Sequence, residues 1–147
     1  MTASIAPAQQ SLADLQAQIG QFYADHFYLL DSGRADEWAQ TFTEDGEFWP
    51  PNRPEPLKGR EVLTAGVRKA HAEYEEQDEQ RRHWHGMVSV RPQDDGSLLV
   101  RCYAQILVTA KDGPTRLHLS CVCHDRFVWD EGQWRVQSRK VTRDDLR

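Results

Sequence analysis

The chain has 147 residues, and its 18 Lys and Arg against 23 Asp and Glu give a formal net charge of −5. This length suits one compact domain, and the acidic balance does not favour a nucleic-acid-binding surface. No apolar run approaches the roughly 20 residues that span a bilayer, and the first ten residues lack the basic and apolar segments of a secretion signal. We therefore expect a cytoplasmic protein whose partners include neither nucleic acid nor membranes.

The cysteine count is three, which is odd and too small for a disulfide framework. Cys121 and Cys123 share one face of an expected strand, whereas His118 and His124 have the opposite parity, which disfavours a zinc site built from these four residues. We expect all three cysteines, including Cys102, to be buried and reduced thiols.

Residues 1–10 are expected to form a flexible tail ahead of a single domain over residues 11–147. The first helix begins at Ser11, a good N-cap, and ends at residues 31–33, where a glycine favours termination. Its apolar residues recur at steps of three and four, which predicts one buried face. Continuing that pattern places His26 on the buried face. The apolar positions are Leu12, Leu15, Ile19, Phe22, Leu29 and Leu30.

A short second helix is predicted over residues 35–42, followed by a turn and a short strand within residues 43–49. Prolines make residues 50–56 an irregular loop. A third helix is expected over residues 60–77, and the charged stretch over residues 73–82 is typical of a solvated face.

From residue 83 onward the apolar period changes to two, which predicts four antiparallel strands joined by short turns. Both faces of the longer strands carry apolar residues, so we expect helices to cover one face and a second copy of the chain to cover the other. Asp125 shares its parity with large apolar residues and is expected to be buried and paired with Arg139 or Arg135. The expected strands are residues 83–91, 98–109, 116–129 and 134–142.

Four local patterns follow one another along the chain. They are Leu30-Asp31-Ser32-Gly33 through Trp38, Phe42-Thr43-Glu44-Asp45-Gly46, Arg82-His83-Trp84-His85-Gly86, and His124-Asp125-Arg126-Phe127 through Gly132-Gln133-Trp134-Arg135. In this order and spacing they resemble the SnoaL-like proteins of the ketosteroid isomerase, scytalone dehydratase and nuclear transport factor superfamily. The resemblance implies an α+β fold, a cone-shaped α+β barrel with three N-terminal helices packed in the concave face of a curved, mostly antiparallel sheet. This fold hosts many reactions and some proteins that are not enzymes.

Asp31 is the first candidate catalytic residue. It lies at the C-terminal end of the first helix, where the helix dipole disfavours a negative charge and so favours a carboxyl that exchanges protons. His83 and His85 share one strand face with Met87, a candidate substrate contact, and imidazoles exchange protons near neutral pH. The resemblance implies a catalytic Asp at residue 31 and one catalytic His in this stretch, so both histidines are candidates. A turn carboxylate and structural histidines are the alternatives.

His26 is a further catalytic candidate, because related dehydratases often have a Tyr at this position. A core histidine satisfied by hydrogen bonds is an equally good interpretation. Tyr23, Trp49 and Tyr74 are candidate substrate-binding aromatics, with core packing as the alternative.

A carboxylate and an imidazole that face one cavity suit acid–base chemistry on a small molecule. With the resemblance, they predict a cofactor-independent enzyme of polyketide-like biosynthesis that catalyses cyclisation (including epoxide-opening ring closure), dehydration or isomerisation. Two His and one Asp could also bind a metal, but the relatives work without one, so no metal is expected. The alternative is a non-catalytic module that resembles the small subunit of aromatic-ring dioxygenases, or a ligand-binding protein, with its histidines bonded in a filled core.

Overall fold

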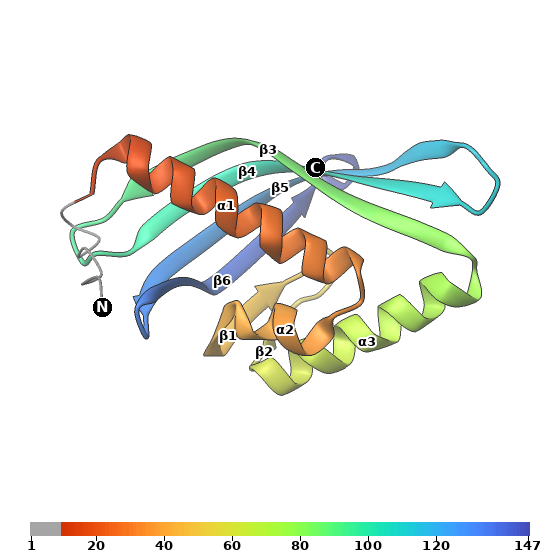
Figure 1. Cartoon of the computed structure of the whole chain (residues 1–147), viewed down its shortest axis with the longest axis horizontal. Helices are drawn as coiled ribbons and strands as arrows, with labels where there is room; N and C mark the ends of the chain where they lie inside the picture. The colour runs from red at the N-terminus through yellow and green to blue at the C-terminus, as the bar shows by residue number, and fades with distance from the viewer. Residues whose placement is uncertain (1–9) are drawn as a thin grey trace.

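The computed structural model describes residues 10–147, so the tail expected over residues 1–10 falls almost entirely outside the described residues. The elements are α1 (Leu12–Asp31), α2 (Ala35–Gln40), β1 (Phe42–Trp49), β2 (Leu57–Lys58), α3 (Arg60–Glu76), β3 (Glu79–Pro92), β4 (Leu98–Ala110), β5 (Thr115–Asp130), β6 (Gln133–Arg143) and a terminal 3-10 turn (Asp144–Leu146). The helices pack against a sheet with strand order β2-β1-β6-β5-β4-β3 (Figure 1). The expected α+β fold is confirmed, with the curved sheet left open between its edges β2 and β3.

Helix α1 begins where the sequence predicts. The Ser11 side chain accepts a hydrogen bond from the backbone N–H of Asp14 at 3.1 Å, which satisfies one free donor of the first turn. The helix ends at Asp31, and Gly33 follows with a φ of 72°, which its missing Cβ allows. One face of the helix is buried, and it consists of Leu15, Ile19, Tyr23, His26 and Phe27.

Residues 42–49 form one continuous strand, β1, where we expected a helix end, a turn and a short strand. The backbone N–H of Val136 donates to the carbonyl of Thr41 at 3.0 Å, and β1 then runs parallel to β6. Gly46 lies in an irregular part of this pairing, where an added Cβ would come 2.8 Å from the Cβ of Phe42. The glycine therefore permits close packing within a bulged strand and does not make a turn.

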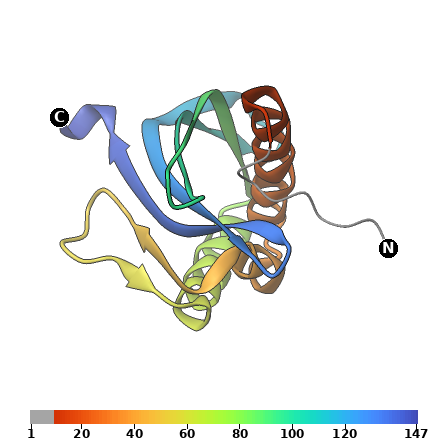
Figure 2. The same cartoon turned by 90° about the vertical axis from the view of Figure 1, so that its left-hand side faces the viewer.

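Strands β3 to β6 form the antiparallel meander that the period-two pattern predicts. Strand β3 begins at Glu79, four residues earlier than expected. The charged stretch over residues 73–82 is therefore a helix end followed by the start of a strand, and this places Arg81 in the sheet. Figure 2 shows how the sheet curves around the space beside α1 and α3.

A β-bulge interrupts β3 between Gly86 and Ser89, in its pairing with β4. Met87 takes a φ of 54° within this bulge, and the residue is 74% exposed. The strict alternation that would have placed Met87 on the same face as His85 ends at the bulge, and Met87 does not line the cavity described below.

The core lies between the helices and the concave face of the sheet. Its apolar side chains come from all three helices and from strands β1 and β3 to β6. As expected, Asp125 is buried and accepts two hydrogen bonds from Arg139, each 2.9 Å long, and all three cysteines are free and buried. None of the helices in residues 10–147 is long and apolar enough to cross a membrane.

Candidate active site

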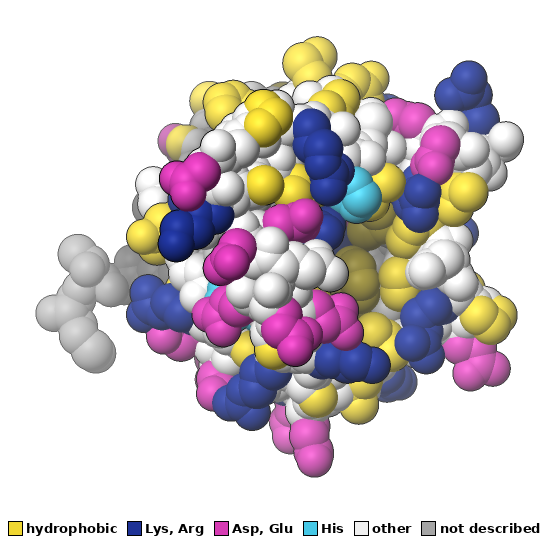
Figure 3. All heavy atoms as spheres, turned by 90° about the vertical axis from the view of Figure 1, so that its right-hand side faces the viewer, with side chains coloured by type: hydrophobic (Ala, Val, Ile, Leu, Met, Phe, Trp, Pro, Cys, Tyr) yellow, Lys and Arg dark blue, Asp and Glu magenta, His cyan; other side chains and the backbone are white. Residues whose placement is uncertain are grey.

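A cavity of about 610 Å³ lies between the helices and the concave face of the sheet. The C-terminal end of α1, helix α3 and strands β1 and β3 to β6 all contribute to its walls. Figure 3 shows one end of the molecule hollowed, with hydrophobic side chains in the hollow and charged side chains around it. A mostly apolar space of this volume suits an organic small molecule.

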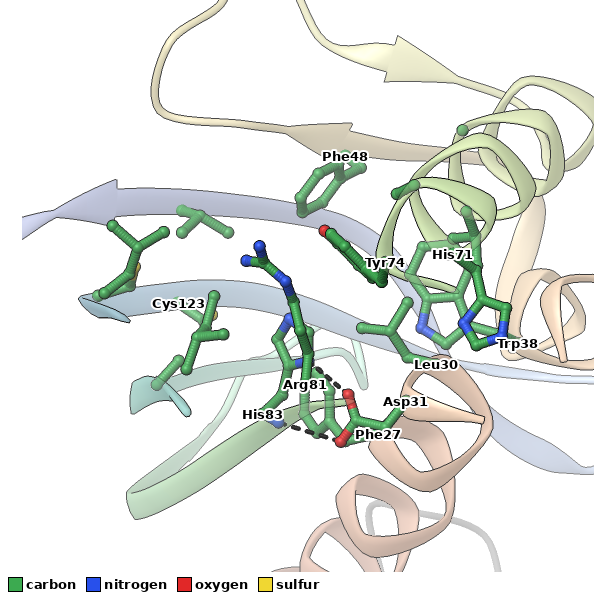
Figure 4. Close-up of a pocket in the computed structure, with 18 of the residues that line it drawn as sticks. Phe27, Leu30, Asp31, Trp38, Phe48, His71, Tyr74, Arg81, His83 and Cys123 are labelled. Atoms are coloured by element: carbon green, nitrogen blue, oxygen red, sulfur yellow. Dashed lines mark hydrogen bonds and ion pairs between the residues drawn. The ribbon is translucent and has the colours of Figure 1, made fainter. Parts of the chain in front are cut away.

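Asp31 and His83 form a hydrogen-bonded pair on this cavity. The Nδ1 atom of His83 lies 2.6 Å from one carboxylate oxygen of Asp31, and the backbone N–H of His83 donates to the other oxygen at 3.0 Å (Figure 4). The side chains of Asp31 and His83 are only 6% and 21% exposed. The last turn of α1 thus holds the carboxylate against β3, and the register of β3 decides which imidazole it meets.

His85 also lines the cavity but does not pair with Asp31. Its ring stacks on Phe27, with 3.5 Å between the ring centroids, and its Nε2 atom lies 3.6 Å from the Sγ atom of Cys123. Burial, with the nearby Arg139 guanidinium, lowers the pKa of His85 to about 2, so this imidazole is neutral. Its Nδ1 atom is buried and has no hydrogen-bond partner in the described part of the chain.

Arg81 reaches the same cavity, and our reading of the sequence missed it. Its guanidinium carbon lies 4.1 Å above the ring centre of Tyr74, and a guanidinium nitrogen lies 3.7 Å from Glu79. The Nε atom is buried and unpartnered among residues 10–147. Figure 4 shows Arg81 and Tyr74 directed toward the space beside His83. The sequence did contain an indication of this placement, because Arg81 has the same strand parity as His83. The charged residues around Arg81 concealed that parity.

The structure places His26 and Tyr23 behind the cavity wall. The Nδ1 atom of His26 lies 2.7 Å from the Thr41 hydroxyl, and its Nε2 atom accepts a hydrogen bond from Arg139 at 2.9 Å. Tyr23 donates its hydroxyl proton to Asp125 at 2.7 Å. Burial and the Arg139 charge hold the pKa of His26 well below its usual value. Both side chains belong to one buried polar network, and neither lines the cavity.

Trp49 also lies away from the cavity walls. It is exposed, its indole N–H donates to the carbonyl of Arg53 at 3.0 Å, and Lys140 lies over its ring. The expectation that Trp49 and Met87 contact substrate therefore has no support in the cavity geometry, whereas Tyr74 does line the cavity.

The described residues contain one group of three metal-ligating side chains close enough to share an ion: His85, Cys102 and Cys123. Asp31 and His83 contact each other but do not belong to that group, and no third ligand atom joins them in the described chain. The metal site considered from the sequence, with both histidines and Asp31 as ligands, is therefore not assembled.

Comparison with known proteins relates this chain to a family. A model of the SnoaL-like domain matches residues 11–140. Aln2 from a Streptomyces species is 32% identical over 93% of this chain and 95% of its own, with a TM-score of 0.85. ActVI-ORFA from Streptomyces coelicolor is 30% identical over 90% of this chain and 96% of its own, with a TM-score of 0.83.

A protein from Catenulispora acidiphila, solved in complex with S-DNPA, is 32% identical over 91% of this chain and 96% of its own, with a TM-score of 0.81. The search of curated proteins found no match.

Proposed function

Since this chain belongs to the SnoaL-like domain family, we propose that it is a small acid–base enzyme of polyketide-like natural-product biosynthesis. The reaction is a cyclisation, a dehydration or an isomerisation of a small organic molecule. The observation that carries this proposal is the Asp31–His83 pair, with a 2.6 Å contact, on a cavity of about 610 Å³.

His83 is the proposed general acid and base. Asp31 accepts a hydrogen bond from the Nδ1–H of His83, which fixes the tautomer and leaves Nε2 as the atom that can take a proton from the substrate. The carboxylate also stabilises the imidazolium that forms when Nε2 is protonated. The same imidazolium then returns its proton to the substrate. The proton goes to the departing hydroxyl in a dehydration, to the epoxide oxygen in an epoxide-opening cyclisation, or to a carbon in an isomerisation.

Arg81 is the proposed stabiliser of negative charge on the substrate. Removing a proton next to a carbonyl places charge on the carbonyl oxygen, and a fixed cation in a poorly solvated site stabilises that oxyanion strongly. The buried Nε atom of Arg81 lacks a partner in the described chain, and its guanidinium is held by stacking on Tyr74. A substrate oxygen would supply the partner that this donor lacks.

The non-catalytic alternative requires a filled core in which the histidines bond to the protein. His26 meets that condition, but His83 and His85 both line an open cavity. This placement supports an enzyme over a purely structural module.

We also propose a homodimer formed through the outer face of the sheet. Trp84 on β3 and Tyr103 on β4 are 69% and 54% exposed and have the strand parity opposite to that of the cavity residues His83 and His85. Large aromatic side chains are typical of the centre of a protein–protein interface.

The proposed activity can be tested with the natural substrate. Deleting the gene in the source organism should cause one intermediate to accumulate, and the purified protein should convert that intermediate without added metal. As a binding probe, S-DNPA, the ligand of the Catenulispora relative, should bind the wild-type cavity. Binding without any conversion of the accumulated intermediate would contradict the enzyme and favour the binding module.

A further inference from the structure

Two thiols and one imidazole from neighbouring strands meet at the inner wall of the cavity. Cys102 on β4 and Cys123 on β5 are directly opposite each other in the antiparallel pairing, and His85 comes from β3 on the other side of β4. Their ligating atoms all lie within 4.8 Å of one another, and the Nε2 atom of His85 lies 3.6 Å from the Sγ atom of Cys123. Nothing in the acid–base chemistry of Asp31 and His83 uses this cluster.

These separations fit the coordination sphere of zinc. Bonds of about 2.0–2.1 Å to imidazole nitrogen and about 2.3 Å to thiolate sulfur, at a tetrahedral angle, place the two ligand atoms about 3.6 Å apart. The contact between His85 and Cys123 already has that length. We propose that His85, Cys102 and Cys123 form a binding site for Zn²⁺, with the fourth coordination position open toward the cavity.

The imidazole of His85 is positioned and chemically available. Its ring stacks on Phe27 and packs beside Tyr23, with centroid distances of 3.5 and 5.7 Å, so little ordering is needed on metal binding. Its contact with the Cys123 thiol is its sole side-chain hydrogen-bonding contact in the described structure, and a thiol is a weak donor. Because this contact is weak, a Zn²⁺ ion can replace it at Nε2 without breaking a strong hydrogen bond of the ring.

The charge balance also favours a divalent ion. Two thiolates would neutralise Zn²⁺, and the nearby Asp125 and Arg139 neutralise each other. The two thiols come from directly paired positions of β4 and β5 and lie within 4.8 Å of each other and of the His85 ring nitrogen. The third cysteine, Cys121, is buried and lines the cavity without belonging to the cluster, so it provides a matched comparison.

The open position follows from the placement of the three ligands. His85 and Cys123 line the cavity, whereas Cys102 lies behind them with no exposed surface. Three protein ligands with one position left for water or substrate are typical of a reactive zinc site, and Cys₂His is one of the known ligand sets. A ligand oxygen in the cavity would therefore be within reach of a bound zinc ion.

Cobalt(II) is the probe, because its bonds to thiolates produce a near-ultraviolet charge-transfer band and tetrahedral ligand-field bands. The full chain is reduced with a phosphine, freed of metal with a chelator that is then removed, and titrated with Co²⁺. We expect one Co²⁺ per chain, with displacement by Zn²⁺. The C123S variant should weaken binding by about 100-fold or more and the H85Q variant by at least about tenfold, because loss of even a group that supports a ligand costs about 10–100-fold. The C121S variant should bind within about threefold of wild type.

Circular dichroism verifies that each variant is folded. If C123S is not folded, C102S replaces it as the variant that lacks one thiol of the cluster. The absence of a thiolate–cobalt band in the folded wild type would overturn the proposal. Equal weakening by C121S and C123S would also overturn it, because it would show non-specific thiol binding. A Cys102–Cys123 disulfide on mild oxidation, together with no metal binding, would instead assign a redox pair. The readout is metal binding, so failure here leaves the proposed acid–base activity standing.

Discussion

The buried ion pair between Asp125 and Arg139 allows a quantitative test of what holds the cavity wall in place. The guanidinium of Arg139 is 3% exposed and the carboxylate of Asp125 is fully buried. Burial lowers the pKa of Arg139, but the adjacent carboxylate outweighs that effect and raises it above its ordinary value, so Arg139 keeps its charge. The D125A variant would leave this charge unpaired, which costs about 3–5 kcal/mol.

The hydroxyl of Tyr23 would lose its acceptor in the same variant, which adds about 1 kcal/mol or more. We therefore expect the free energy of unfolding to fall by at least about 4 kcal/mol, measured by urea denaturation with circular dichroism. The D36A variant is the matched control, because it removes an exposed ion pair with Arg68 and should cost less than about 1 kcal/mol. The double variant D125L/R139M should recover much of the loss. If D125A is as mild as D36A, the network does not support the wall.

Three further predictions concern His26, Gly33 and the outer face of the sheet. Because the pKa of His26 is lowered in the folded chain, its stabilisation is present above pH 6.5 and lost below it, about 2 kcal/mol between pH 7 and pH 5. The H26Q variant should show a correspondingly smaller pH dependence in urea denaturation, and the exposed H124Q control should not. The G33A variant should lose more stability than G96A, because both glycines have positive φ but only at Gly33 would an added Cβ collide with a neighbour, the His71 ring. We expect the excess loss to be about 1 kcal/mol in thermal melts, and equal losses would contradict the close contact. The W84E variant should be monomeric by light scattering while wild type is dimeric, and a dimeric W84E would exclude Trp84 from the interface.

The sequence predicted those parts of the fold that depend on local patterns. The period of α1, the cap at Ser11 and the short turns between β3 and β6 are all encoded within a few residues, and all are present. Only the last three residues of β1 were predicted as a strand, and residues 42–46 were missed because the partner strand β6 is far away in sequence and runs parallel to β1. A parallel pairing between distant segments leaves no hairpin turn to read.

The site was predictable in its residue types and not in its pairings. Asp31 and the two histidines could be selected from helix and strand positions, but 52 residues separate Asp31 from His83, and only the register of β3 against α1 selects that imidazole over His85. At Met87 the predicted alternation of strand faces fails, since a bulge reverses the parity of a strand without a clear signature in the sequence. Neighbouring charges concealed Arg81, because a run of charged residues is usually solvated.

The central role of the Asp31–His83 pair is tested most directly by the turnover of the D31N variant on the intermediate that accumulates in the deletion strain. An amide cannot hold the His83 imidazolium as a carboxylate does, so kcat should fall by about 10²-fold or more while KM changes little. The matched control is D25N, an exposed position on the same helix, which should retain wild-type turnover. If kcat for D31N equals that of D25N and wild type, Asp31 does not take part in the reaction.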